Sequence, residues 1–178
     1  FETRDQIITH CADYLTGTGS TRALKAAARQ AYRSASRAHT ISKRSWPKTT
    51  DCDRLDAAFD DLNARGIMAR HNWTCCQTCG HAEMPDEYDR IVTNDPTITI
   101  RGYCFYHMQD LESAAQGHGI YLAYDALPGG SQLAIGREIS AALKKRGLKV
   151  QWNGKTNQRI GIPMNWQRRK RPKKWVGE

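Results

Sequence analysis

Residues 51–162 alternate between amphipathic segments with helical periodicity and short apolar segments, with glycine at several of the junctions. In the first such pair, Leu55, Phe59 and Leu62 recur at the spacing of one helix face. Gly66 then supplies the left-handed residue that often ends a helix, and the apolar residues after it fit a strand. Repetition of this pattern restricts the chain to folds in which helices pack against a sheet.

The sequence predicts an α+β fold, in which two N-terminal helices are followed by a four- to five-stranded sheet with packed helices. Ser20 is the expected cap of the second helix, and Trp46-Pro47 marks a linker that starts near residue 39. A further helix is expected near the cysteines, without defined bounds. The other helices are expected over 2–16, 20–38, 51–65, 108–116 and 132–146. Strands are expected over 67–73, 98–107, 119–126, 148–152 and 159–163.

The distribution of charged residues divides the chain into three parts. Eight basic residues and no acid lie between Tyr14 and Thr50, fourteen acids and six bases between Asp51 and Glu138, and twelve bases and no acid between Ile139 and Gly177. We therefore expect a basic helical segment and linker over 1–50, an α+β domain with a Cys/His site over 51–166, and a basic tail over 167–178. The two basic ends either bind an anionic partner or fold back on the acidic middle.

Nucleic acid is the anionic partner that these basic ends would fit. One set of cations lies on a single face of the second helix, and the other lies in the tail: Arg22, Lys25, Arg29, Arg33, Arg37, Arg168, Arg169, Lys170, Arg171, Lys173 and Lys174. Trp166 and Trp175 flank the tail, and aromatic rings beside cations suit stacking on unpaired bases. The alternative is a solubilising tail together with a helix that packs on the acidic middle.

Three of the six cysteines lie within residues 75–79, and their spacing resembles that of a zinc site. Cys76 and Cys79 form a CxxC pair, and Cys104 and His107 form a CxxH pair, with 24 residues between the two pairs. Thiolate sulfur and imidazole nitrogen are the ligands that tetrahedral zinc favours, and two such pairs would supply four of them. The sequence thus predicts a zinc ion held by these four residues.

Two other interpretations of the cysteines remain open. A cysteine between a strand and a helix has a lowered pKa, so Cys75, Cys76 or Cys79 could serve as a redox thiol or a nucleophile. His107 would then act as the base and Asp110 would orient it. Alternatively, the cysteines fill a hydrophobic core, because free cysteine is among the most buried residue types.

Several stretches, including "LNARGIMARHNWTCCQTCGHAEM", "RGYCFYHMQD" and "RIGIPMNWQRR", together resemble a family of small bacterial proteins classed as a domain of unknown function. The resemblance covers about residues 51–169, so the basic helix and linker before it would be specific to this chain and absent from other family members. It implies a bacterial or phage source and no activity. The family pattern CCxxCGxxE and FxHxQD falls on Cys75, Cys76, Cys79, Glu83, His107, Gln109 and Asp110. Other members carry an apolar residue at the position of Cys104, which implies that Cys75 takes its place as a ligand, or that Gln109 joins a thiol site.

No run of eighteen apolar residues is present, so no membrane-spanning helix is expected, and no charged-then-apolar leader opens the chain. The cysteine spacing suits a reducing compartment, which predicts a cytoplasmic protein. Three functions remain open: a zinc-stabilised binding module, a thiol-dependent enzyme, and an inhibitor or adaptor that acts by protein–protein contact.

Overall fold

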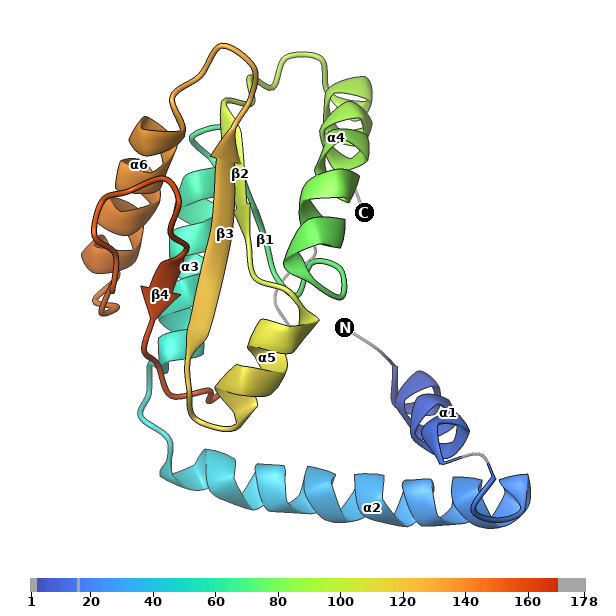
Figure 1. The fold of residues 1–178 in the computed structure, drawn as a ribbon. Helices are drawn as coiled ribbons and strands as arrows, with labels where there is room; N and C mark the ends of the chain where they lie inside the picture. The colour runs from blue at the N-terminus through green and yellow to red at the C-terminus, as the bar shows by residue number, and fades with distance from the viewer. Residues whose placement is uncertain (1–2, 16, 170–178) are drawn as a thin grey trace. The chain divides into compact units, whose positions relative to one another are not determined.

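The computed structural model describes residues 3–15 and 17–169. These residues form two compact units, one ending at Lys48 and the other starting at Thr49 (Figure 1). Across this described part of the chain, no helix is both long and apolar enough to span a bilayer.

The N-terminal unit contains the helices α1 (Arg4–Tyr14) and α2 (Thr21–Ser42) and the short 3-10 helix η1 (Lys43–Ser45). Both expected helices are confirmed, and the Ser20 side chain caps α2 by accepting a hydrogen bond from the backbone of Ala23. The predicted start of the linker is wrong, because the chain stays helical to Ser45. Pro47 restricts the residue immediately before it, and Trp46 is accordingly extended, with φ and ψ of −74° and 146°.

The second unit contains α3 (Asp51–Asn63), β1 (Ile67–Arg70), α4 (Gln77–Asn94), β2 (Gly102–Phe105), α5 (Met108–Ala115), β3 (Ile120–Ala126), α6 (Gln132–Lys145) and β4 (Ile160–Ile162). The strands form a sheet in the order β1-β2-β3-β4, in which β1 and β2 are parallel and the other neighbours are antiparallel. This architecture confirms the predicted α+β class, with the smaller of the two expected numbers of strands.

The segment 148–152, predicted as a strand, contributes only an isolated bridge between Gln151 and Gly161. The next residue, Trp152, packs its ring edge-on against the Tyr124 ring with the centroids 6.0 Å apart and is not paired in the sheet. A single paired residue does not make a fifth strand, so this prediction is wrong.

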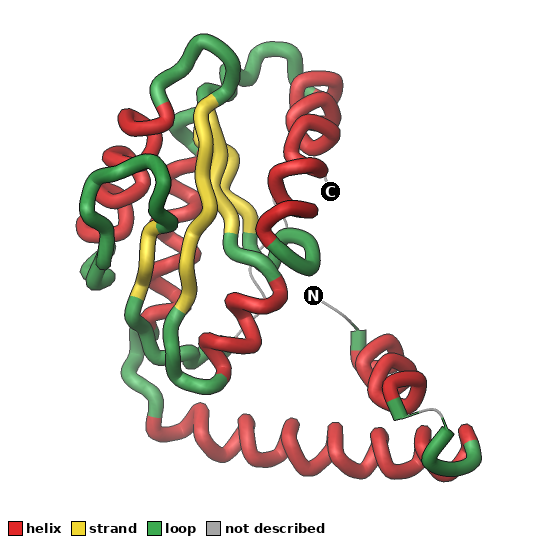
Figure 2. Tube along the Cα trace, viewed as in Figure 1, coloured by secondary structure: helices red, strands yellow, loops and turns green. Residues whose placement is uncertain are grey.

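Helices α3 and α6 lie on one face of the sheet and α4 on the other (Figure 1, Figure 2). The buried side chains accordingly form two hydrophobic clusters, one on each face. Successive residues of a strand point to opposite faces, and Cys104 of β2 joins the cluster of α3 and α6. Its neighbours Tyr103 and Phe105 join the smaller cluster under α4. The face that a β2 side chain occupies therefore decides whether it can approach the start of α4.

Candidate metal site

The parallel strands β1 and β2 end at the same edge of the sheet, and each leads through a short segment into a helix, α4 or α5 (Figure 1). Two backbone hydrogen bonds continue the pairing beyond the strands. Trp73 N donates to Tyr106 O at 2.8 Å, and Met108 N donates to Thr74 O at 3.1 Å. Residues 71–76 therefore lie beside the start of α5, at the carboxyl end of parallel strands where α/β sheets commonly bind ligands.

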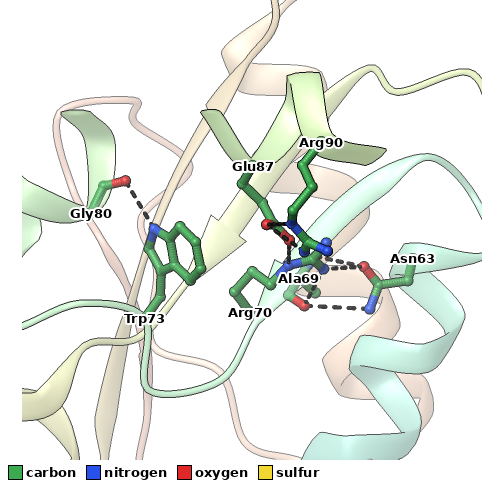
Figure 3. A network of polar contacts seen from close by, with 7 residues as sticks. All are labelled: Asn63, Ala69, Arg70, Trp73, Gly80, Glu87 and Arg90. Atoms are coloured by element: carbon green, nitrogen blue, oxygen red, sulfur yellow. Dashed lines mark hydrogen bonds and ion pairs between the residues drawn. The ribbon is translucent and has the colours of Figure 1, made fainter. Parts of the chain in front are cut away.

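Two residues of this segment have left-handed backbone conformations, Asn72 with φ of 49° and Thr74 with φ of 56°. For a β-branched residue such as Thr74 this conformation is unusual and costs on the order of 1–3 kcal/mol. The Thr74 hydroxyl donates to Cys76 O at 3.1 Å, and Trp73 Nε1 donates to Gly80 O of α4 at 3.1 Å (Figure 3). Such strain persists only where surrounding contacts impose it, and it is concentrated at functional sites.

A buried ion pair joins the two elements that flank the segment. Arg70, the last residue of β1, donates from Nε to Glu87 Oε1 of α4 at 2.6 Å (Figure 3). Their side chains are 6% and 4% exposed. Arg70 Nη1 also donates to Asn63 Oδ1 at 3.1 Å, and Arg90 Nη2 donates to Glu87 Oε2 at 2.6 Å. The network fixes the direction in which the chain leaves β1 relative to α4.

The Sγ atoms of Cys75, Cys76 and Cys79 all lie within 4.8 Å of one another, and this cluster could bind a metal ion. Cys75 is exposed and the other two are half-buried. Sulfur ligands of tetrahedral zinc lie about 3.8 Å apart, given a Zn–S bond of about 2.3 Å, so little movement would be needed. The backbone N–H of Cys79 bonds to the Cys76 sulfur and lowers the pKa of Cys76. Hydrogen bonds from the Cys79 thiol to the other two sulfurs raise the pKa of Cys79 to about 11.

Cys104 does not join this cluster, which corrects the predicted ligand set of Cys76, Cys79, Cys104 and His107. Its thiol is fully buried in the hydrophobic cluster under α3 and α6, and this desolvation raises the pKa of Cys104. The residues on either side of it in β2 face α4, so alternation along the strand directs Cys104 to the opposite face. For this cysteine the packing interpretation holds.

His107 lies at the start of α5 and forms a buried polar pair with Asp110. Its Nε2 is 3.1 Å from Asp110 Oδ2, and its backbone N donates to the same oxygen at 3.1 Å. Burial lowers the pKa of His107, so the ring is neutral near pH 7 and donates to Asp110 from Nε2. Its Nδ1 is buried and has no hydrogen-bond partner among the described residues. The ring lies outside the group of three sulfurs, although Met108 hydrogen-bonds to the cysteine segment.

Arg159, which precedes β4, also contacts Asp110 and is absent from the predicted site. Its Nη2 donates to Asp110 Oδ2 at 2.5 Å and to the Tyr121 carbonyl, and its guanidinium lies 5.6 Å from the centroid of the Tyr121 ring. The two residues of the ion pair are 49 positions apart, so no local spacing could have indicated it. Gln109, predicted at this site, is exposed, and so is Glu83 on α4.

The beginning of the predicted basic tail folds back on the acidic helix α3. Arg168 donates to both carboxylate oxygens of Asp56 at 2.9 Å, and its side chain is only 10% exposed. Trp166, which was expected to stack on bases, is half-buried and packs edge-on against Tyr106, with the ring centroids 5.9 Å apart. Arg169 Nη1 lies 3.6 Å from an Asp53 carboxylate. Four predicted cations and one tryptophan lie outside the described residues: Lys170, Arg171, Lys173, Lys174 and Trp175.

The other predicted set of cations projects from α2. Arg22, Arg29, Arg33 and Arg37 are exposed and Lys25 is half-buried. Of the described residues of α2, none is buried, and the ion pairs found within residues 3–15 and 17–169 include none of these five cations. The two basic ends thus differ in their described residues, because Arg168 pairs with Asp56 whereas the four arginines of this set on α2 are exposed.

Residues 1–170 match the model of a family described as a domain of unknown function (DUF6891). The chain belongs to this family. The match confirms the expected kind of family. It extends further than the expected residues 51–169, so the N-terminal helix pair is part of the family match and is not specific to this chain. No curated protein and no solved structure matches the chain.

Proposed function

We propose that the protein binds one zinc ion through Cys75, Cys76 and Cys79. The observation that supports this most directly is the mutual distance of the three sulfurs, which lie within 4.8 Å of one another. Thiolates favour zinc over harder cations such as magnesium and calcium. The position of the sulfurs at the start of α4 adds to this, because a helix N-terminus stabilises the negative charge that three thiolates bring. Cysteines stay unoxidised in a reducing compartment, which agrees with a cytoplasmic location.

His107 is the fourth ligand in this proposal. A histidine that binds a metal almost always donates its other ring N–H to a carboxylate or carbonyl, which fixes the tautomer and leaves the second nitrogen for the metal. The His107–Asp110 pair has this arrangement, with Nε2 on the carboxylate and Nδ1 buried without a partner. Because the ring lies outside the sulfur group, binding would require the imidazole and the sulfur group to move toward each other.

The metal content of protein purified under reducing conditions tests the zinc proposal. We expect about one zinc per chain, lost in Cys75→Ser, Cys76→Ser and Cys79→Ser. Cys11→Ser is the matched control, because Cys11 is exposed on α1 and has no part in the cluster. Cobalt substitution tests the fourth ligand: His107→Gln should leave a cobalt complex of three thiolates with a shifted visible spectrum. Folded wild-type protein that binds neither metal would refute the zinc site and direct attention to thiol chemistry.

A second candidate function is the binding of an anionic macromolecule by α2. Lys25, Arg29, Arg33 and Arg37 follow one another at intervals of four residues, so they form three like-charge pairs on one face of the helix. Each pair destabilises an isolated helix by about 0.2–0.5 kcal/mol, and a polyanion would remove this repulsion. No acidic residue lies between Tyr14 and Thr50 to oppose such a partner.

Retention on immobilised heparin tests this second function. We expect Arg29→Gln/Arg33→Gln to elute at clearly lower salt than the wild type. Lys144→Gln/Lys145→Gln is the control, since it removes the same charge from exposed positions at the end of α6. Equal shifts for the two variants would mean that net charge alone, and no particular surface, governs retention.

A further inference from the structure

The cations of α2 form a narrow band along one side of a long helix. With 3.6 residues per turn, Arg22, Arg29 and Arg33 lie within about 40° of one another around the axis, and Lys25 and Arg37 widen the band to about 120°. The fifteen-residue interval from Arg22 to Arg37 corresponds to about 22 Å at 1.5 Å per residue. The band therefore has the length and the charge to follow several consecutive phosphates.

The rest of the helix is slender. Small residues stand between the cations on the same side, at Ala26, Ser36 and Thr40, and the opposite side is built largely of alanine. An α-helix with its side chains is about 10–12 Å wide, and the major groove of B-form DNA is about 12 Å wide. The exposed arginine side of α2 would fit that groove, with α1 packed against the helix at Tyr32 and arginine side chains long enough to reach phosphates on both walls.

The same residues argue against three other anionic partners. Single-stranded nucleic acid is bound through stacked aromatic rings, but Tyr32 is occupied by Arg4, whose guanidinium lies 5.9 Å from its ring centroid. Membrane-binding helices carry Trp, Phe or Leu opposite their cations, whereas α2 offers large aliphatic residues only at Leu24 and Ile41. Double-stranded RNA has a major groove too deep and narrow for a helix to enter.

We propose that α2 binds double-stranded DNA by lying in the major groove with Arg22, Arg29 and Arg33 directed at the phosphates. This DNA proposal rests on the proposed binding of a polyanion by α2 and identifies that polyanion as double-stranded DNA. Because the face consists of arginine, lysine and small residues, most of the affinity comes from counterion release and little from base recognition.

Fluorescence anisotropy of the full chain with a labelled duplex of about 20 base pairs tests this, with the salt concentration varied from about 50 to 200 mM. Five neutralised phosphates would give a slope of log K against log salt of up to about −4.5. Arg29→Gln/Arg33→Gln should weaken binding and flatten the slope by about 1.8. Arg29→Lys/Arg33→Lys should keep the slope, and Lys144→Gln/Lys145→Gln should leave it unchanged.

Single-stranded DNA, double-stranded RNA and anionic phospholipid vesicles are measured with the same proteins. Preferential binding of duplex DNA that is lost in Arg29→Gln/Arg33→Gln supports the proposal. If α2-dependent heparin binding persists while duplex DNA binds no better than the other three ligands, the DNA assignment is overturned and polyanion binding stands. If heparin and duplex DNA both fail to bind, or bind independently of α2, both proposals are overturned.

Discussion

Replacing Glu87 by glutamine should destabilise the second unit strongly, because it removes a carboxylate charge that pairs with the buried Arg70 guanidinium. The Arg70 and Glu87 side chains are 6% and 4% exposed, with Nε and Oε1 2.6 Å apart. Removing one partner of such a buried pair costs about 3–5 kcal/mol, a large part of the 5–15 kcal/mol that stabilises a typical domain. For a unit of this size, Tm should fall by roughly 10–20 °C.

An exposed ion pair of the same length is the matched control. Arg146 Nη2 and Asp61 Oδ1 are also 2.6 Å apart, but their side chains are 38% and 27% exposed. Water screens this pair, so Asp61→Asn should cost no more than about 1 kcal/mol. Both variants are compared by urea denaturation in the presence of a chelator, so that bound metal does not contribute to the stability. Arg70→Met/Glu87→Met should recover much of the loss, because it removes the buried charge as well. A Glu87→Gln cost no larger than that of Asp61→Asn would refute the reasoning.

Further predictions concern pH, packing and metal. Burial holds the pKa of His71 well below its ordinary value, with Arg168 and Arg70 adding to the effect. The unfolded chain therefore takes up a proton near pH 6.5 that the folded chain does not, so stability should fall as the pH drops below about 6.5, by up to about 1.4 kcal/mol per pH unit. His71→Phe should reduce this slope in urea denaturation between about pH 7.5 and 5.5, and an unchanged slope would assign the effect to other groups. A Cβ on Gly80 would lie 2.3 Å from the Phe105 ring, so Gly80→Ala should cost about 1–3 kcal/mol, with partial recovery in Gly80→Ala/Phe105→Leu. A chelator should lower the Tm of zinc-loaded wild type but not that of Cys76→Ser.

Local sequence signals determined most of the elements. The periodicity of Leu55, Phe59 and Leu62 and the glycine at 66 delimit α3, whose N-terminal residue is Asp51 as predicted, and Ser20 caps α2. The bounds of α4 could not be derived in this way. It begins at Gln77, its N-cap Cys76 makes no side-chain capping hydrogen bond, and Pro85, a helix-breaking residue, lies inside it.

The sequence by itself determined that three thiols lie together, because Cys75, Cys76 and Cys79 occupy one turn at the start of a helix and need no distant partner. Tertiary structure decided the rest of the site. Cys104 belongs to the core because the register and the alternation of β2 direct it away from α4. Glu87 pairs with Arg70 across 17 residues, Asp110 with Arg159 across 49, and Asp56 with Arg168 across 112. Such contacts depend on which strands are neighbours and which face of each helix is buried. The local periodicity of the sequence specifies neither the order of the strands nor the surface against which each helix packs.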